Sequence, residues 1–478
     1  MDIIGRKDEI YELENRYRSG LPEFIAIHGR RRVGKTYLVD QLFAGRMSFR
    51  HTGLSPYDRA KRNLLSDQLK HFHQSLLSFG AHCSAPTSWL EAFYQLQTLL
   101  ESTDDGSRQV VFLDELPWMD TPRSRFITAL EAFWNNWGAR RENLMLIVCG
   151  SSTAWIENHL INGKGGLYDR LTDDIKLSPF SLAECEQFLE SRSIRYSRYD
   201  IVLSYMVFGG IPYYLGYFEK GLSVAQNIDR ILFAKNAKLK GEFDRLFGSL
   251  FSHPDEYKAV VSFLAKRRGG YTRKEITDAG VIQEGGGATK VLESLEASDF
   301  ITAYIPYKEG KRERRYRLCD PFCIFCLHFQ ANMDMEDPNY WKNQTGGHVL
   351  DNWRGLAFEN VCLAHVDQIK RVLGISGVSS QQYPWLVRNE KNIVAQIDMI
   401  IDRADNVVNL CEMKFYTAPF VINKTDDLAF RTRLAALASE LPSRKTIHFT
   451  VITSFGIVRN QYSGFVQKEV VMDDLFQS

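Results

Sequence analysis

The chain has no excess of charge of either sign and no long apolar run. Its 478 residues include 59 Lys and Arg against 58 Asp and Glu, so no global basic field marks it as a nucleic-acid binder. No run approaches the roughly 18 apolar residues that span a bilayer, and the start, MDIIGRKDE, has no apolar signal region. We therefore expect a cytoplasmic protein without a membrane partner, and its length favours two to four domains.

Cysteine is also sparse. Eight cysteines in a chain of this length do not make a disulfide framework, so we expect reduced thiols. Cys319, Cys323 and Cys326, with His328 nearby, form the one grouping that suggests a metal site. The residues between them are nearly all apolar and no second ligand pair stands at zinc spacing, which favours a buried helix instead.

The most informative segment is residues 29–36, whose letters GRRRVGKT fit the pattern G-x-x-x-x-G-K-[ST]. An apolar run at 24–27 precedes it and helical spacing follows, which is the context of a phosphate-binding loop. Backbone N–H groups close around phosphates, Lys35 neutralises their charge and the Thr36 hydroxyl ligates Mg²⁺. The segment predicts a triphosphate site built from Gly29, Arg30, Arg31, Arg32, Val33, Gly34, Lys35, Thr36 and Tyr37.

A second apolar run, residues 110–113, ends at Asp114 and Glu115 and has the form of a Walker B strand. A continuous apolar run fits a parallel strand covered on both faces. Asp114 is expected to hold Mg²⁺ and Glu115 to polarise the attacking water; the alternative is a strand that ends in two solvated acids. A third run, 144–150, leads to Ser151, whose hydroxyl either senses the γ-phosphate or only caps a helix.

Four segments together resemble those of the archaeal-type AAA ATPases, which are assigned to the STAND group of signalling NTPases. They are GRRRVGKT, FLDELPW from residue 112, CGSS from residue 149 and GGIPYYL from residue 209. The resemblance covers nearly the whole chain and implies ATP as the bound nucleotide. It also implies an α/β fold with a P-loop NTPase core (1–177), a helical lid (178–250), a winged-helix domain (251–335) and a PD-(D/E)XK nuclease-like α/β domain (336–478).

The same resemblance gives roles to two further residues. It places Pro212 near the nucleotide base, and Arg170 where a planar, permanently charged guanidinium reads the γ-phosphate. Both have structural alternatives, because Gly-Gly-Pro is also a helix stop followed by a preset first turn, and Arg170 fits a salt bridge on a surface helix. The three loop arginines either steer the triphosphate or sit in water.

The middle of the chain is helical in pattern and then changes. Residues 178–235 fit a lid, residues 257–264 and 289–295 have helical spacing, and Thr272 and Glu275 form a capping box between them. Two strand-like segments follow, at 300–305 and 314–318. Three short helices and a hairpin are the order of a winged helix.

Charge is the available guide to what this winged helix binds. Its wing is basic, and we expect the cations to be able to contact phosphates without reading bases; they are Lys308, Lys311, Arg312, Arg314, Arg315 and Arg317. The helix that would enter a major groove carries Lys290 but also Glu293 and Glu296, followed by Asp299. The sequence therefore favours protein docking slightly over specific DNA readout.

The last third has a second chemical grouping. Residues 396–402 alternate as a strand and 407–414 return, so Glu412 and Lys414 share one face. Asp398, thirteen intervening residues and Glu412-x-Lys414 resemble the PD-(D/E)XK nucleases, although Ile397 stands where the bare pattern has proline. The resemblance makes Asp398, Glu412 and the helical Glu359 metal ligands, and Lys414 the group that positions or activates water.

Two hypotheses follow for the whole chain. In the first, Lys35 and Glu115 support Mg²⁺-dependent ATP hydrolysis, and the nucleotide state controls a DNA-directed nuclease in which Glu412 and Lys414 are catalytic. In the second, the same ATPase is a switch that cleaves nothing, and its winged helix and tail dock a protein partner. The sequence carries no signal for an oligomeric state.

Overall fold

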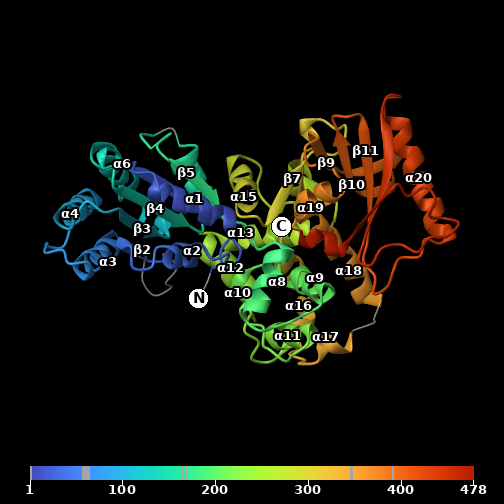
Figure 1. The fold of residues 1–478 in the computed structure, drawn as a ribbon, viewed down its shortest axis with the longest axis horizontal. Helices are drawn as coiled ribbons and strands as arrows, with labels where there is room; N and C mark the ends of the chain where they lie inside the picture. The colour runs from blue at the N-terminus through green and yellow to red at the C-terminus, as the bar shows by residue number, and fades with distance from the viewer. Residues whose placement is uncertain are drawn as a thin grey trace. The chain divides into compact units, whose positions relative to one another are not determined.

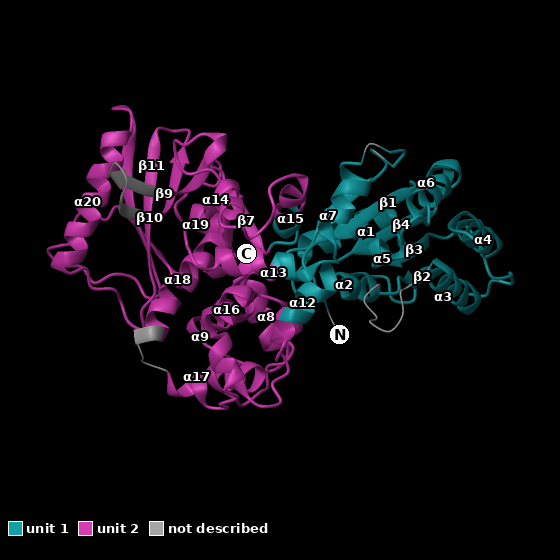
Figure 2. Ribbon diagram, turned by 180° about the vertical axis from the view of Figure 1, so that it is seen from behind, with its two compact units in different colours: residues 1–179, 244–257, 293–299 teal, residues 180–243, 258–292, 300–478 magenta. Residues whose placement is uncertain are grey.

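The computed structural model describes residues 3–55, 65–163, 165–167, 169–344, 348–389 and 392–477. The chain divides into two compact units, coloured separately in Figure 2. The first comprises residues 1–179, 244–257 and 293–299, and the second comprises 180–243, 258–292 and 300–478. Within the described ranges no helix is long and apolar enough to cross a membrane. The four-domain division stays a prediction.

The first unit is built on a five-stranded parallel sheet in the order β2-β3-β4-β1-β5 (Figure 1). Every residue of the three central strands is buried, which confirms the predicted parallel strands covered on both faces. The strands are β1 (Glu23–His28), β2 (Met47–Thr52), β3 (Gln109–Asp114), β4 (Leu144–Gly150) and β5 (Asp173–Lys176).

Helices of the first unit supply the apolar side chains that cover one face of this sheet. Leu and aromatic residues of α3, α4 and α6 pack with alternate residues of β1, β3 and β4 in one cluster, in which Phe72 and Trp89 are central. The helices are α1 (Lys7–Arg18), α2 (Lys35–Leu42), α3 (Leu65–Ser78), α4 (Trp89–Ser102), α5 (Leu116–Met119), α6 (Phe126–Asn136), α7 (Thr153–Ile156) and α12 (Glu242–Leu250), of which α12 begins in the second unit.

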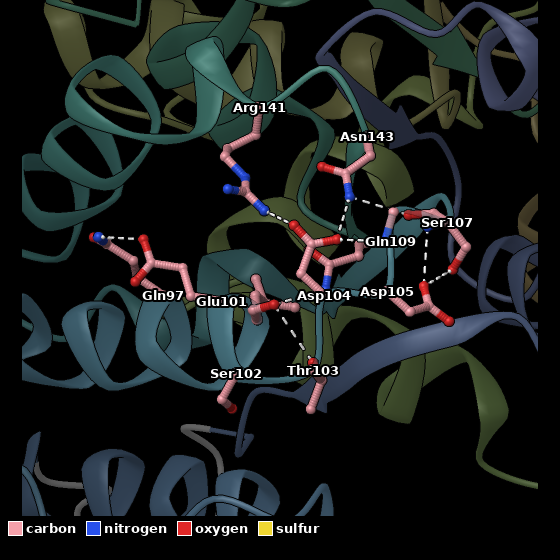
Figure 3. A network of polar contacts seen from close by, with 12 residues as sticks. Gln97, Glu101, Ser102, Thr103, Asp104, Asp105, Ser107, Gln109, Arg141 and Asn143 are labelled. Carbon is pink, nitrogen blue, oxygen red and sulfur yellow. Dashed lines mark hydrogen bonds and ion pairs between the residues drawn. The ribbon is translucent and has the colours of Figure 1, made fainter.

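A polar network fixes the turn that leads into β3, at the end of this strand opposite Asp114 (Figure 3). Asp104 accepts a hydrogen bond from Asn143 at 2.8 Å and from the backbone N–H of Gly106 at 3.0 Å, and it pairs with Arg141. Gln109, the first residue of β3, donates to the carbonyl of Leu100 at 2.8 Å. These bonds set where β3 starts and hence where its acidic end lies.

The second unit opens with helices, as the expected lid does. They are α8 (Leu182–Ser191), α9 (Arg198–Phe208), α10 (Pro212–Leu215) and α11 (Val224–Ile228), joined later in the chain by α16 (Pro321–Asp334), α17 (Tyr340–Asn343), α18 (His348–Ala364) and α19 (Val366–Val372). Cys323 and Cys326 are buried on α16, which confirms the buried-helix interpretation for these two residues, whereas Cys319 precedes the helix and is half-buried. All eight cysteines are free thiols. Within the described ranges no group of three or more His, Cys, Asp or Glu side chains is arranged to hold a metal ion.

The segment expected to be a winged helix has the predicted element order. It contains α13 (Pro254–Leu264), α14 (Arg273–Asp278), α15 (Gly286–Ala297), β7 (Ile301–Tyr304) and β8 (Arg315–Leu318). The capping box of Thr272 and Glu275 is present at α14. An additional strand, β6 (Tyr271–Thr272), pairs with β8 in a three-stranded sheet. The winged-helix assignment itself stays a prediction.

The tail carries a five-stranded mixed sheet in the order β13-β12-β11-β10-β9. Figure 1 labels three of its strands, β9, β10 and β11. The predicted hairpin is present, with β10 antiparallel to β11, while β12 runs parallel to β11. Aromatic and aliphatic residues of α20 pack on one face, and α18 packs against β11. The elements are β9 (Ser380–Asn389), β10 (Asn392–Arg403), β11 (Val407–Lys414), α20 (Lys424–Glu440), β12 (Thr446–Thr453) and β13 (Lys468–Val471).

Candidate nucleotide site and carboxylate cluster

The glycines of the predicted phosphate loop adopt the backbone that the motif requires. Gly29 has φ 129° and Gly34, which precedes the first residue of α2, has φ 98°. A Cβ at Gly29 would lie 2.3 Å from the carbonyl oxygen of Leu177, closer than any side chain tolerates. Glycine is therefore needed at position 29 for packing as well as for its backbone angle.

Lys35 lies inside this loop. Its ammonium donates to the carbonyl oxygens of Gly29 at 2.8 Å and Arg30 at 3.1 Å, and the side chain is buried. Burial lowers the pKa of Lys35, whereas the nearby Glu115 and Asp114 carboxylates act to raise it. The ammonium is thus held within the loop, where a phosphate chain would meet it.

Thr36 and Asp114 meet at the end of the sheet, as the two motifs predict. The Thr36 hydroxyl lies 3.1 and 3.2 Å from the two carboxylate oxygens of Asp114. The buried Cys149 thiol donates to the same carboxylate at 2.7 Å. Burial and the adjacent Glu115 raise the pKa of Asp114. A hydroxyl oxygen beside a carboxylate is the ligand pair that Mg²⁺ takes, so these residues fit the predicted ion.

Glu115 and Ser151 are joined by two hydrogen bonds. The Ser151 hydroxyl donates to one carboxylate oxygen of Glu115 at 2.6 Å, and the Ser151 N–H donates to the other at 3.1 Å. Glu115 has φ 48°, in the left-handed region that a non-glycine residue adopts only when its surroundings hold it there. The two acids of the Walker B strand are therefore not free in solvent.

The loop arginines do not sit in open water. Arg30 is 1% exposed, and its guanidinium donates to the carbonyl of Arg31 at 3.2 Å. Arg31 is half-buried, with its guanidinium 5.8 Å from the centre of the Trp118 ring, and Arg32 is half-buried as well. Val33 is buried, whereas Tyr37 is 43% exposed on α2. A steering role for these residues stays a prediction.

The two residues carried over from the family pattern have simple surroundings. Pro212 is the first residue of α10, after Gly209 and Gly210, both at φ 67°. This is the helix stop and preset turn given as the structural alternative. Arg170 is exposed in the loop before β5, outside any helix, so the alternative of a surface helix does not hold at this position. Contact of Pro212 or Arg170 with nucleotide stays a prediction.

The tail residues predicted from sequence lie together in the second unit. Asp398 on β10 accepts a hydrogen bond from the N–H of Met413 on β11 at 3.1 Å. Glu412 and Lys414 stand on either side of Met413 in the sequence. Glu412 is 2% exposed, and its carboxylate pairs with the Lys414 ammonium at 2.8 Å. Glu359 is supplied by α18 and is nearly buried. We call these four residues the carboxylate cluster: Glu359, Asp398, Glu412 and Lys414.

Two arginines that sequence reasoning missed complete the cluster. Arg268, between α13 and β6, places one guanidinium nitrogen against both Glu359 and Asp398, 2.7 Å from the Asp398 oxygen. Arg433 on α20 binds Glu412 at 2.6 Å. The only sequence signal is the basic run of residues 266–268, and nothing in it indicates which acid it would meet.

The electrostatics of the cluster follow from burial. Burial and the neighbouring Glu412 raise the pKa of Asp398 to about 6, against the opposing charge of Arg268. The oxygens of Glu359 and Asp398 converge on one guanidinium nitrogen, so they point to a single cation position. Because no three acidic side chains within the described ranges are arranged to hold a metal, the predicted ligands would have to draw together with Arg268 displaced.

Relatives of this chain are known by sequence and by structure. An uncharacterized protein of Methanocaldococcus jannaschii is 23% identical over 361 residues, which cover 73% of this chain and 75% of that protein. Among solved structures, a Walker-type ATPase of Pyrococcus abyssi is 18% identical, over 68% of this chain and 96% of its own, with a TM-score of 0.45. The ORC2 protein of Aeropyrum pernix is 14% identical, over 72% and 96%, with a TM-score of 0.39.

A family model describes the amino-terminal part. Residues 3–218 match the family described as an ATPase domain predominantly from Archaea. The match includes the loop from Gly29 to Thr36, Asp114, Glu115 and Ser151, whose geometry is given above. The amino-terminal part of the chain is therefore similar to an ATPase domain that occurs predominantly in Archaea, and the chain is an ATPase.

Proposed function

We propose that this ATPase uses ATP and Mg²⁺, and that its nucleotide state controls a DNA-directed, nuclease-like carboxylate cluster in the tail. The observation that carries the proposal is the meeting of Glu359, Asp398, Glu412 and Lys414, which come from three different elements. Residues that are far apart in the sequence but converge in space, as these four do, are expected of a chemical site. Sheet stability alone does not require three buried carboxylates.

In the nucleotide site, Thr36 and Asp114 are the residues that would hold Mg²⁺, and the ion would offset charge on the transferred phosphate. Lys35 neutralises the phosphate chain. Glu115 orients the attacking water and accepts its proton, while Ser151 fixes the direction of the Glu115 carboxylate through the bonds at 2.6 and 3.1 Å.

In the tail, Asp398, Glu359 and Glu412 are the residues that would hold a divalent ion, which would polarise a phosphodiester. Lys414 then positions a water for attack through its ammonium, which is anchored by Glu412 at 2.8 Å. Arg268 stands between two of these acids, so a cation reaches them only when the guanidinium leaves. Arg268 belongs to the segment expected to be a winged helix. A movement of that segment would therefore control access of a cation to the acids.

The test is cleavage by the full chain. Wild type and Lys414→Ala are incubated with single-stranded, duplex and branched DNA in Mg²⁺ or Mn²⁺, with and without ATP. Lys424→Ala, which removes an exposed lysine at the start of α20, is the matched control. Cleavage by wild type and Lys424→Ala, lost in Lys414→Ala and changed by ATP, supports the proposal. Equal cleavage by all three proteins contradicts it.

The alternative is an ATP-dependent switch that cleaves nothing and docks a protein partner. It is favoured by the state of the basic wing: Arg315 is 5% exposed and lies 3.6 Å from Glu275, and Lys308 pairs with Glu440. These two cations are engaged within the protein, which weakens the expected contact of the wing with phosphates. Absence of cleavage together with ATP-dependent binding of a partner protein would favour this alternative.

A further inference from the structure

A pocket of about 360 Å³ opens beside the carboxylate cluster, within the second unit. Tyr199 of α9, Arg354 and Glu359 of α18, and the residues from Lys414 to Tyr416 at the end of β11 line it. Glu359 and Lys414 also belong to the cluster, so whatever fills the pocket lies next to the proposed reacting groups. A volume of this size is within the range of small-ligand sites.

The pocket holds a desolvated cation. Arg354 is 8% exposed, and its guanidinium donates a hydrogen bond to Asp351 at 3.3 Å, a side chain that is itself 58% exposed. Its Nε is buried and has no hydrogen-bond partner within the described residues. A buried guanidinium with so few partners is suited to a phosphate, which a planar fork binds through two oxygens.

The pocket also holds aromatic rings in fixed positions. Tyr199 stacks on Phe415 with centres 4.9 Å apart and planes 11° apart. Tyr416 stacks on Phe420 at 5.3 Å and 5°, while remaining 49% exposed. Rings held in this way lose little freedom when a flat ligand stacks on them, and the bases of single-stranded nucleic acids bind proteins by such stacking.

We propose that this pocket receives one nucleotide of a nucleic-acid strand, with its phosphate on Arg354 and Lys414 and its base against Tyr416. The inference rests on the proposed function because Lys414 serves both. A cation beside an exposed aromatic ring matches the two parts of a nucleotide. An acidic peptide would use the cations but not the ring, which is why Tyr416→Ala is part of the test.

The test measures binding without cleavage. Fluorescence anisotropy of a labelled single-stranded oligonucleotide is followed with the full chain in EDTA, at fixed salt. Arg354→Ala and Tyr416→Ala are each expected to weaken binding about tenfold, since each removes a phosphate or a stacking contact. Arg354→Lys is expected to recover part of the loss, and Tyr416→Phe nearly all of it. Because Tyr416 is exposed, Tyr416→Ala should fold normally, so it tests the pocket even if the Arg354 variants misfold.

Arg444→Ala is the matched control. Arg444 is exposed before β12, near the end of β11 opposite Lys414, because Val407 pairs with Thr446 and Lys414 with Thr453. Its loss should leave affinity unchanged. Wild-type affinity in both pocket alanine variants, or no oligonucleotide binding by the wild type, overturns the inference. Pocket-dependent binding without metal-dependent cleavage overturns the proposed nuclease alone, whereas cleavage with wild-type KM in both pocket variants overturns the pocket alone.

Discussion

Ser151 donates a hydrogen bond to each oxygen of the Glu115 carboxylate, from its hydroxyl at 2.6 Å and from its backbone N–H at 3.1 Å. Ser151 directly follows β4 and Glu115 directly follows β3, and these strands are neighbours in the parallel sheet. Because Glu115 has φ 48°, its position depends on such contacts rather than on a relaxed backbone. The expected sensor of the γ-phosphate thus also holds the expected base.

Replacing Ser151 by Ala should therefore slow ATP turnover. Loss of the hydroxyl removes one charge-assisted hydrogen bond, and a reduction in kcat of about tenfold is expected. KM should stay close to that of the wild type, because the phosphate loop is untouched. Phosphate release measured over a range of ATP concentrations checks this, with Ser151→Thr as the conservative control. An equal kcat for Ser151→Ala would show that Ser151 does not position Glu115.

Gly29→Ala should destabilise the first unit. The new Cβ would lie 2.3 Å from the Leu177 carbonyl oxygen, and crowding adds to the backbone strain for a total of about 3 kcal/mol. Gly45→Ala is the matched control, since Gly45 also has positive φ but no atom within 4 Å of its Cβ position, and about 1 kcal/mol is expected. Thermal unfolding of the full chain compares the two. Equal losses would contradict the steric account.

The stability of the second unit should depend on pH through Asp398. Its pKa is raised to about 6 from an ordinary 3.8, so the folded state binds the proton more tightly than the unfolded state. The contribution of Asp398 to the free energy of unfolding is therefore fully present below about pH 4. It is lost as the pH rises through about 6, by about 3 kcal/mol in all. Urea unfolding at a series of pH values should show this slope in wild type and not in Asp398→Asn. Parallel pH profiles would contradict it.

Arg268→Ala should open the carboxylate cluster to a cation. The guanidinium binds both Glu359 and Asp398, so its removal leaves two buried acids that a divalent ion can neutralise. Mn²⁺ affinity measured by calorimetry on the full chain, in the absence of nucleotide, is expected to rise at least about tenfold. Arg267→Ala is the control, because Arg267 pairs with Glu275 at 2.7 Å instead. No gain in affinity would remove Arg268 from this role.

Local patterns predicted which residues of the candidate nucleotide site lie together. The loop from Gly29 to Thr36 and the strand that ends at Asp114 are short motifs whose chemistry is set by neighbours in sequence, and the sheet brings their ends together. β2 was not predicted, because its residues include Arg50 and the buried His51. Arg50 pairs with Asp40, and Nδ1 of His51 hydrogen-bonds with Ser75, so these polar groups find partners on helices elsewhere in the unit.

Long-range partners account for what the sequence missed in the tail. Asp398 and Arg268 are 130 residues apart in the sequence, and no local pattern around either residue predicts the other as its partner. Their pairing depends on where the middle segment lies against β10, which is set by tertiary packing. The hairpin of β10 and β11 was predicted because alternation and the turn at residues 403–406 are local signals.

Phosphate release by wild type and Glu115→Gln, at saturating Mg²⁺ and ATP, tests the account most directly. Glu115→Gln keeps the size of the side chain but removes its basicity and one of the two oxygens that accept from Ser151, so the rate should fall at least about 100-fold. Bound ATP, measured separately by equilibrium dialysis, should be retained in Glu115→Gln and lost in Lys35→Ala. Equal rates of release by wild type and Glu115→Gln would contradict the assignment of this site.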